Sequence, residues 1–143
     1  MSYPWMITYA DITDEVIRKL TDAYLTTRPD ADKNYYDLTA DKFISFANSF
    51  GIDVSVLNQL NRTDNKIHYM VLQWLITCFH MLVSQNLIGL NNDEMVNDKW
   101  KYKYTMYRDD LKTISSKISY EMIVNGVMQQ NYTRYSNTFR IMV

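Results

Sequence analysis

Three kinds of residue are scarce in this chain, and each scarcity excludes a class of structure or site. Its 143 residues include only 3 glycines, 2 prolines and 1 cysteine. A single cysteine allows neither an internal disulfide framework nor a pair of thiolates on a zinc ion. So few glycines and prolines leave too few turn residues for a sandwich or barrel of short strands, and long helices are expected instead.

The glycines also exclude nucleotide-binding loops, because they stand far apart, whereas GxGxxG and GxxxxGK[S/T] need several close together. The only imidazole or thiol groups belong to His68, Cys78 and His80. Cys78 and His80 are two apart on a predicted helix, where their side chains diverge by about 200°. Neighbouring acidic residues are better explained as helix caps and solvated faces than as acid and base pairs. We therefore expect no metal site, no cofactor and no enzymatic activity.

Charge is balanced over the whole chain, with a net charge of -1. The chain thus lacks the basic excess typical of proteins that bind nucleic acid through its phosphates. After residue 98, however, eight basic side chains stand against three acidic ones. Lys99, Lys103 and Lys117 lie along one edge of a predicted helix there and are candidate phosphate contacts. A small helical DNA-binding regulator therefore remains an alternative function.

The length and a hydrophobic content of 47% are typical of one domain with one core. The first residues lack the basic start and apolar run of a signal peptide, so we expect an intracellular protein. The most apolar stretch, Tyr69 to Val83, is about 15 residues long, whereas a membrane span needs about 20 with few polar groups. It also contains Gln73, Thr77 and His80. No membrane segment is expected.

Hydrophobic periodicity predicts an all-α fold, a small bundle of about four to five helices in residues 1–131. The first helix is expected to start at a cap formed by Asp11 or Thr13 and to end before Pro29. Its predicted apolar face consists of Ile12, Val16, Leu20, Ala23 and Tyr24.

A second helix is predicted between a cap at Thr39 and Gly51. Its apolar face consists of Phe43, Phe46, Ala47 and Phe50. Residues 52–62 fit no single element and are left unassigned. Asp64 is the predicted cap of a central helix that ends near Leu87, before Gly89. Most of its circumference is apolar, apart from a line formed by Gln73, Thr77, His80 and Ser84.

The strongest periodicity predicts a helix from about Asp98, with a core-facing stripe. The stripe consists of Trp100, Tyr104, Tyr107, Leu111, Ile114 and Ile118. Tyr102 and Met106 lie opposite it, four residues apart, either as a contact between subunits or as ordinary surface residues. Ser119 is expected to cap a short further helix.

Residues 132–143 are predicted to form an extended C-terminal arm, because they are rich in residues that favour strands. With no other strand in the sequence, such an arm needs an edge on another chain. The candidate partner-binding residues are Tyr135, Phe139, Arg140, Ile141 and Val143. Disorder of the terminus is the alternative.

The order of these features resembles the head-tail connector proteins of tailed bacteriophages, also called adaptor or head-completion proteins. The resemblance lies in the opening Met6 to Ile12, the apolar helix around Trp74, the segment Asp98 to Tyr107, and an extended tail containing Arg140.

This resemblance implies a structural virion protein that forms a ring between the portal and the tail and catalyses no reaction. The implied partners are identical subunits, the portal protein and a tail or stopper component, with DNA passing through the ring without sequence recognition. The implied location is the neck of the virion, after synthesis in the host cytoplasm. Such a subunit is expected to carry spare apolar surface, for which Tyr102, Met106 and the arm are the candidates.

Overall fold

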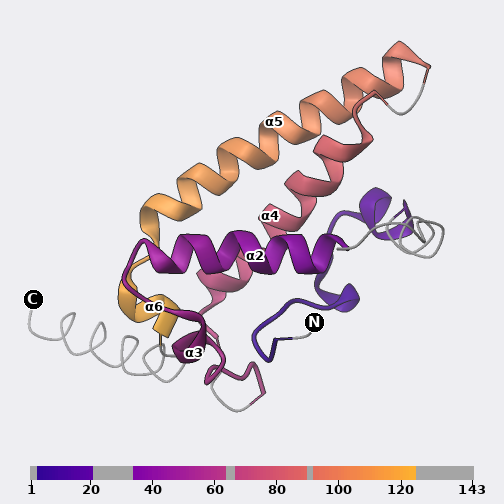
Figure 1. Ribbon diagram of the computed structural model, residues 1–143. Helices are drawn as coiled ribbons and strands as arrows, with labels where there is room; N and C mark the ends of the chain where they lie inside the picture. Colours follow the sequence, from indigo (N-terminus) through magenta and orange to yellow (C-terminus); the bar gives the residue numbers. More distant parts are fainter. Residues whose placement is uncertain (1–2, 21–33, 64–66, 90–91, 125–143) are drawn as a thin grey trace, which may run out of the picture.

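The computed structural model describes residues 3–20, 34–63, 67–89 and 92–124, and the regular elements within these ranges are all helical, without a β-strand (Figure 1). This confirms the predicted all-α class. The elements are the 3₁₀ turn η1 (Tyr9–Asp11), helical residues 15–20, α2 (Tyr35–Asn48), α3 (Val54–Leu57), α4 (Tyr69–Leu87), α5 (Glu94–Lys117) and α6 (Tyr120–Val124).

Helix α4 is the centre of the fold and packs most extensively against α5 and α2. Figure 1 shows α5 running alongside α4 while α2 crosses it. The Trp74 ring lies 5.3 Å from that of Phe43 and is stacked at 5.1 Å on that of Phe46, which joins α4 to α2. Its indole Nε1 donates a hydrogen bond of 2.9 Å to Ser115 Oγ on α5. Trp74 therefore links all three main helices, and its predicted place in the core is confirmed.

The start of α4 differs from the prediction. The helix begins at Tyr69, and its cap is His68, whose Nδ1 accepts a hydrogen bond of 3.1 Å from the Met70 amide. The predicted cap, Asp64, lies outside the described residues. At the other end the helix stops at Leu87 as expected, and Gly89 adopts a left-handed backbone with φ of +84°.

Helix α2 also begins earlier than predicted. Asn34 is its cap and accepts a hydrogen bond of 2.9 Å from the Asp37 amide. Thr39, the predicted cap, is buried inside the helix, where its hydroxyl donates to the Tyr35 carbonyl oxygen at 2.8 Å. A threonine can satisfy its hydroxyl in this way within a helix, so its presence alone does not mark a start. The predicted apolar face and the terminating Gly51 are confirmed.

The unassigned residues 52–62 contain the single turn α3, capped by Asp53, which accepts from the Val56 amide at 3.0 Å.

Helix α5 begins at Glu94 after the cap Asp93 and not at Asp98. Its predicted stripe faces the protein, with both ends buried and the middle half-buried. Ser119 caps α6 as predicted, accepting from the Met122 amide at 3.4 Å.

The first helix has a different register from the predicted one. Its cap is Asp14, whose Oδ1 accepts from the amides of Val16 and Ile17 at 3.0 and 3.1 Å. Ile17 is completely buried, whereas Val16 and Leu20 are exposed. The predicted cap Asp11 instead closes η1 and binds Arg62. Ala23 and Tyr24 lie outside the described residues.

Candidate functional site

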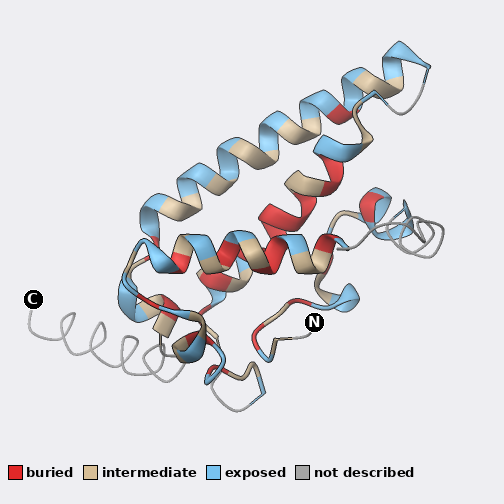
Figure 2. Ribbon diagram, in the orientation of Figure 1, coloured by how far each residue is buried: buried red, intermediate tan, exposed pale blue. Residues whose placement is uncertain are grey.

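Helix α5 carries the first candidate site on the side that faces away from α4. Tyr102 is 71% exposed and Met106 37% exposed, as their spacing predicts for the side opposite the stripe. Met95, 81% exposed, precedes Tyr102 by two helical turns and lies on the same side. We call these three residues the outer face of α5; exposed residues follow this helix over its whole length in Figure 2. Sequence reasoning missed Met95 because it started the helix at Asp98.

On its opposite side α5 contributes Lys103 and Tyr107 to a polar cluster with Asp14 and His80, in which His80 is buried and the other three residues are half-buried. Asp14 Oδ2 accepts a hydrogen bond of 2.8 Å from Lys103 Nζ and another from the Tyr107 hydroxyl. The His80 ring lies 5.0 Å from the Tyr107 ring, so α4 joins the same cluster. One carboxylate thus caps the first helix and also fixes α5 against it.

Burial raises the pKa of Asp14, but hydrogen bonds from Lys103 and Tyr107 outweigh it and lower the pKa to about 2. Asp14 is therefore an anion at neutral pH. Burial lowers the pKa of His80 to about 4, although the nearby Asp14 acts against this shift. His80 is neutral at pH 7, and its Nε2 is buried without a hydrogen-bond partner.

The three candidate phosphate-contacting lysines are not equivalent. Lys99 and Lys117 are exposed, whereas Lys103 is half-buried and forms the ion pair with Asp14. The Lys103 Nζ atom also lies 5.3 Å from the centre of the Trp100 ring. Sequence reasoning placed Lys103 on the flank of α5 but had no signal that Asp14, 89 residues away, reaches it.

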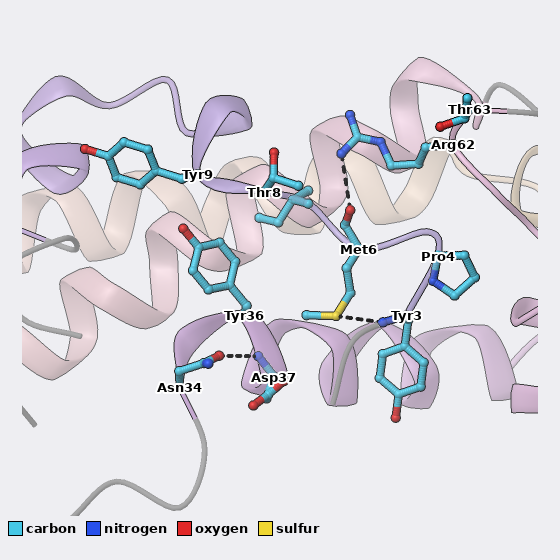
Figure 3. Close-up of a pocket in the computed structure, with 11 residues that line it drawn as sticks. Tyr3, Pro4, Met6, Thr8, Tyr9, Asn34, Tyr36, Asp37, Arg62 and Thr63 are labelled. Atoms are coloured by element: carbon cyan, nitrogen blue, oxygen red, sulfur yellow. Dashed lines mark hydrogen bonds between the residues drawn. The ribbon is translucent and has the colours of Figure 1, made fainter. Parts of the chain in front are cut away.

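A second candidate site is a cavity of about 890 Å³ between the N-terminal segment, residues 3–12, and the start of α2 (Figure 3). Tyr36 projects from α2 toward Thr8 on the opposite wall, and Met6 borders the space between them (Figure 3). The lining consists of Tyr3, Pro4, Met6, Ile7, Thr8, Tyr9, Asn34, Tyr36, Asp37, Arg62 and Thr63. Because these residues come from three separate parts of the chain, periodicity gave no indication of the cavity.

The Arg62 side chain holds one wall of the cavity in place. Its Nη1 and Nη2 donate to the two carboxylate oxygens of Asp11 at 2.5 and 2.9 Å, and Nη1 also donates to the Met6 carbonyl oxygen at 3.2 Å. Burial acts to raise the pKa of Asp11, but the bonds from Arg62 and Thr8 lower it below its usual value. The positive charge of Arg62 is thus matched within the fold.

Four further features considered in the sequence are a metal site, a membrane-spanning helix, the single cysteine and the C-terminal arm. Among the described residues, no three His, Cys, Asp or Glu side chains are grouped as a metal site would need. None of the described helices combines the length and the hydropathy that crossing a bilayer requires. Cys78 is buried, which raises the pKa of its thiol to about 12. The candidate arm residues Tyr135, Phe139, Arg140, Ile141 and Val143 lie outside the described residues.

Comparison with protein-family models, curated proteins and solved structures finds no match to this chain.

Proposed function

We propose that this chain is a subunit of a head-tail connector ring, which joins the portal of a tailed bacteriophage to its tail. The observation that carries the proposal is the outer face of α5. Tyr102 is largely exposed on a helix whose other side already supplies its packing, and Met95 and Met106 extend the apolar surface along the same side. A ring subunit needs such surface for its neighbours.

The charges on α5 fit a protein contact better than a phosphate contact. Asp98, Asp109 and Asp110 are exposed among the basic residues of this helix. Lys103 is paired with Asp14, so two of the three candidate lysines remain exposed for DNA. A duplex that passes through a ring without sequence recognition needs no dedicated basic face on each subunit.

Co-expression with the portal protein of the same virus tests the proposal. We expect the two proteins to purify together and the complex to appear as a ring in electron micrographs. Changing Tyr102→Glu and Met106→Glu together places two charges in the contact and is expected to leave a folded monomer that no longer assembles.

The matched control carries Ser45→Glu and Asn48→Glu, two exposed positions on α2 and not on α5. It adds the same charge and is expected to assemble as the unchanged chain does. Normal assembly of the Tyr102 and Met106 variant would remove the outer face from the contact. Duplex DNA binding that weakens steeply with salt, without portal binding, would favour the DNA-binding alternative.

A further inference from the structure

The side chains along the outer face of α5 are arranged symmetrically about position 104. This helix has 24 residues, is about 36 Å long and lies at the edge of the molecule (Figure 1). Tyr102 lies two residues before position 104 and Met106 two residues after it, and both are exposed. We propose that α5 packs antiparallel against α5 of a second copy of the chain through this face, with a two-fold axis beside residue 104. We call this contact the α5 pair.

Charge is self-complementary in this arrangement. Lys99 lies five residues before position 104 and Asp109 five residues after it, and both are exposed. The two-fold axis therefore places Lys99 opposite Asp109 of the second copy, twice in each pair. Asp98 and Lys112, six residues before and eight after, form a further pair of opposite charges along one edge. A parallel pair in register would place each charge opposite itself, so charge favours the antiparallel orientation.

Apolar side chains form the centre of the contact and extend to its ends. On each side of the axis, Tyr102 of one copy meets Met106 of the other. Met95 lies nine residues before position 104 and faces Thr113, nine residues after it; both are exposed. Thr113 donates its hydroxyl to the Asp109 carbonyl oxygen at 3.1 Å, which leaves its methyl group for this contact. Each copy thus covers the apolar residues of the other.

The charges of the α5 pair are those that the fold leaves at the surface. Among the described residues, Asp109 forms an ion pair with Arg108 at 3.5 Å, and both side chains are exposed. A long, exposed ion pair of this kind contributes little free energy, so it competes weakly with a contact to a second copy. Lys103, by contrast, is held by Asp14 at 2.8 Å on the side facing the protein.

The α5 pair goes beyond the proposed function, and its formation does not depend on it. A two-fold contact closes with two copies, whereas neighbours in a ring meet through a contact that continues from subunit to subunit. The outer face of α5 can serve only one of these contacts at a time. If the proposed function holds, the pair must therefore separate before its subunits join a ring. A single helix-to-helix contact is small, so we expect the pair to dissociate on dilution.

Charge reversal in the full-length chain tests the pair. Lys99→Asp and Asp109→Lys each place like charges opposite each other and are expected to weaken association at least about tenfold in sedimentation velocity. When mixed, the two variants are expected to associate with each other, because both contacts again join opposite charges. The chain that carries both changes keeps its net charge and is expected to associate as the unchanged chain does.

The rescue in the mixture requires a second copy. Residues 99 and 109 are about 15 Å apart along one helix, too far to pair within a chain. Lys42→Asp, an exposed change of equal charge on α2, is the control and is expected to leave association unchanged.

Crosslinking tests the orientation of the two helices. In the antiparallel pair, two copies of position 95, or of position 113, are about 27 Å apart. Met95→Cys and Thr113→Cys are therefore each expected to form no disulfide-linked dimer alone, and to form one when mixed under mild oxidation. A parallel pair would instead link each variant to itself. Cys78 is buried and is expected to take no part.

Four results would overturn the proposal: an unchanged chain that stays monomeric at all concentrations, single charge reversals that associate as the unchanged chain does, a mixture that is not rescued, or each cysteine variant linking to itself. A monomeric unchanged chain would leave the outer face to neighbours in a ring. Ring assembly with the portal protein by a chain that fails the mixing test would leave the proposed function standing and remove this inference. Rescue in the mixture without portal binding would do the reverse.

Discussion

The carboxylate of Asp14 contacts two parts of the chain that are far apart in the sequence. Its Oδ1 caps the first helix and its Oδ2 accepts hydrogen bonds from α5, so two distant parts of the chain depend on the same ionised group. The sequence predicted the cap at Asp11 or Thr13 and not at Asp14. The contacts that separate the roles of Asp11 and Asp14 are those with Arg62 and Lys103, which are too distant in sequence to predict.

The buried histidine gives a testable dependence of stability on pH. His80 has a pKa of about 4 in the folded chain and about 6.5 when unfolded, so the unfolded state takes up the proton first. The free energy of unfolding is therefore expected to fall as the pH drops from about 6.5 to 4, by up to about 3 kcal/mol. Asp14 adds a second loss below pH 3.8, as its carboxylate becomes protonated down to about pH 2.

Urea denaturation at a series of pH values measures this effect. His80→Gln is expected to remove most of the loss between pH 6.5 and 4. His68→Gln is the control at the other of the 2 histidines, whose pKa is also lowered by burial. An equal pH profile for His80→Gln and the unchanged chain would show that His80 is not held neutral.

At the scale of the elements, hydrophobic periodicity predicted which faces of the helices are buried, but it did not predict the residues at which the helices begin. The faces of α2 and α5 were correct because long runs of apolar residues recur at helical spacing. The caps of α2 and α5 were wrong because several Asn, Asp and Thr residues near each start can all accept the capping hydrogen bond. The local sequence does not decide which of these candidate residues is the cap. Packing decides it, since Thr39, the predicted cap of α2, is buried inside the helix.

Trp74 offers a test of the predicted centre of the bundle. Trp74→Ala removes the ring that contacts Phe43 and Phe46 and leaves Ser115 without its donor. We expect a loss of about 3 to 5 kcal/mol in the free energy of unfolding, measured by urea denaturation. Tyr102→Ala, at an exposed position, is the control and is expected to change it by less than about 0.5 kcal/mol. Equal stability of both variants would contradict a central role for Trp74.

At the scale of the whole molecule, the core is assembled from both ends of the described chain. Trp5 is fully buried although its segment has little regular structure, and its ring lies 5.2 Å from that of Phe43. Ile123 of α6 is buried at the other end. The sequence indicated the helical bundle but not this contribution of the N-terminal segment, because a short irregular stretch has no periodicity to detect.

Deletion of the C-terminal arm tests whether residues 132–143 stabilise their own domain or bind other subunits. Because residues 132–143 are predicted to be an arm that binds a partner, deleting them is expected to leave the melting temperature of the dilute chain nearly unchanged. The same deletion is expected to abolish assembly into rings but not the α5 pair. Differential scanning fluorimetry and electron microscopy measure the two effects. A large fall in melting temperature would instead place the arm on its own domain.

The burial of Cys78 has a practical consequence for studies of assembly. A thiol with a pKa of about 12 is almost entirely protonated at pH 7.5 and, being buried, is sheltered from alkylating reagents. A cysteine introduced at position 102 on α5 would be exposed and is expected to react with a maleimide dye much faster than Cys78. The native chain can thus carry a single fluorescent reporter on the outer face of α5 without removal of its own cysteine.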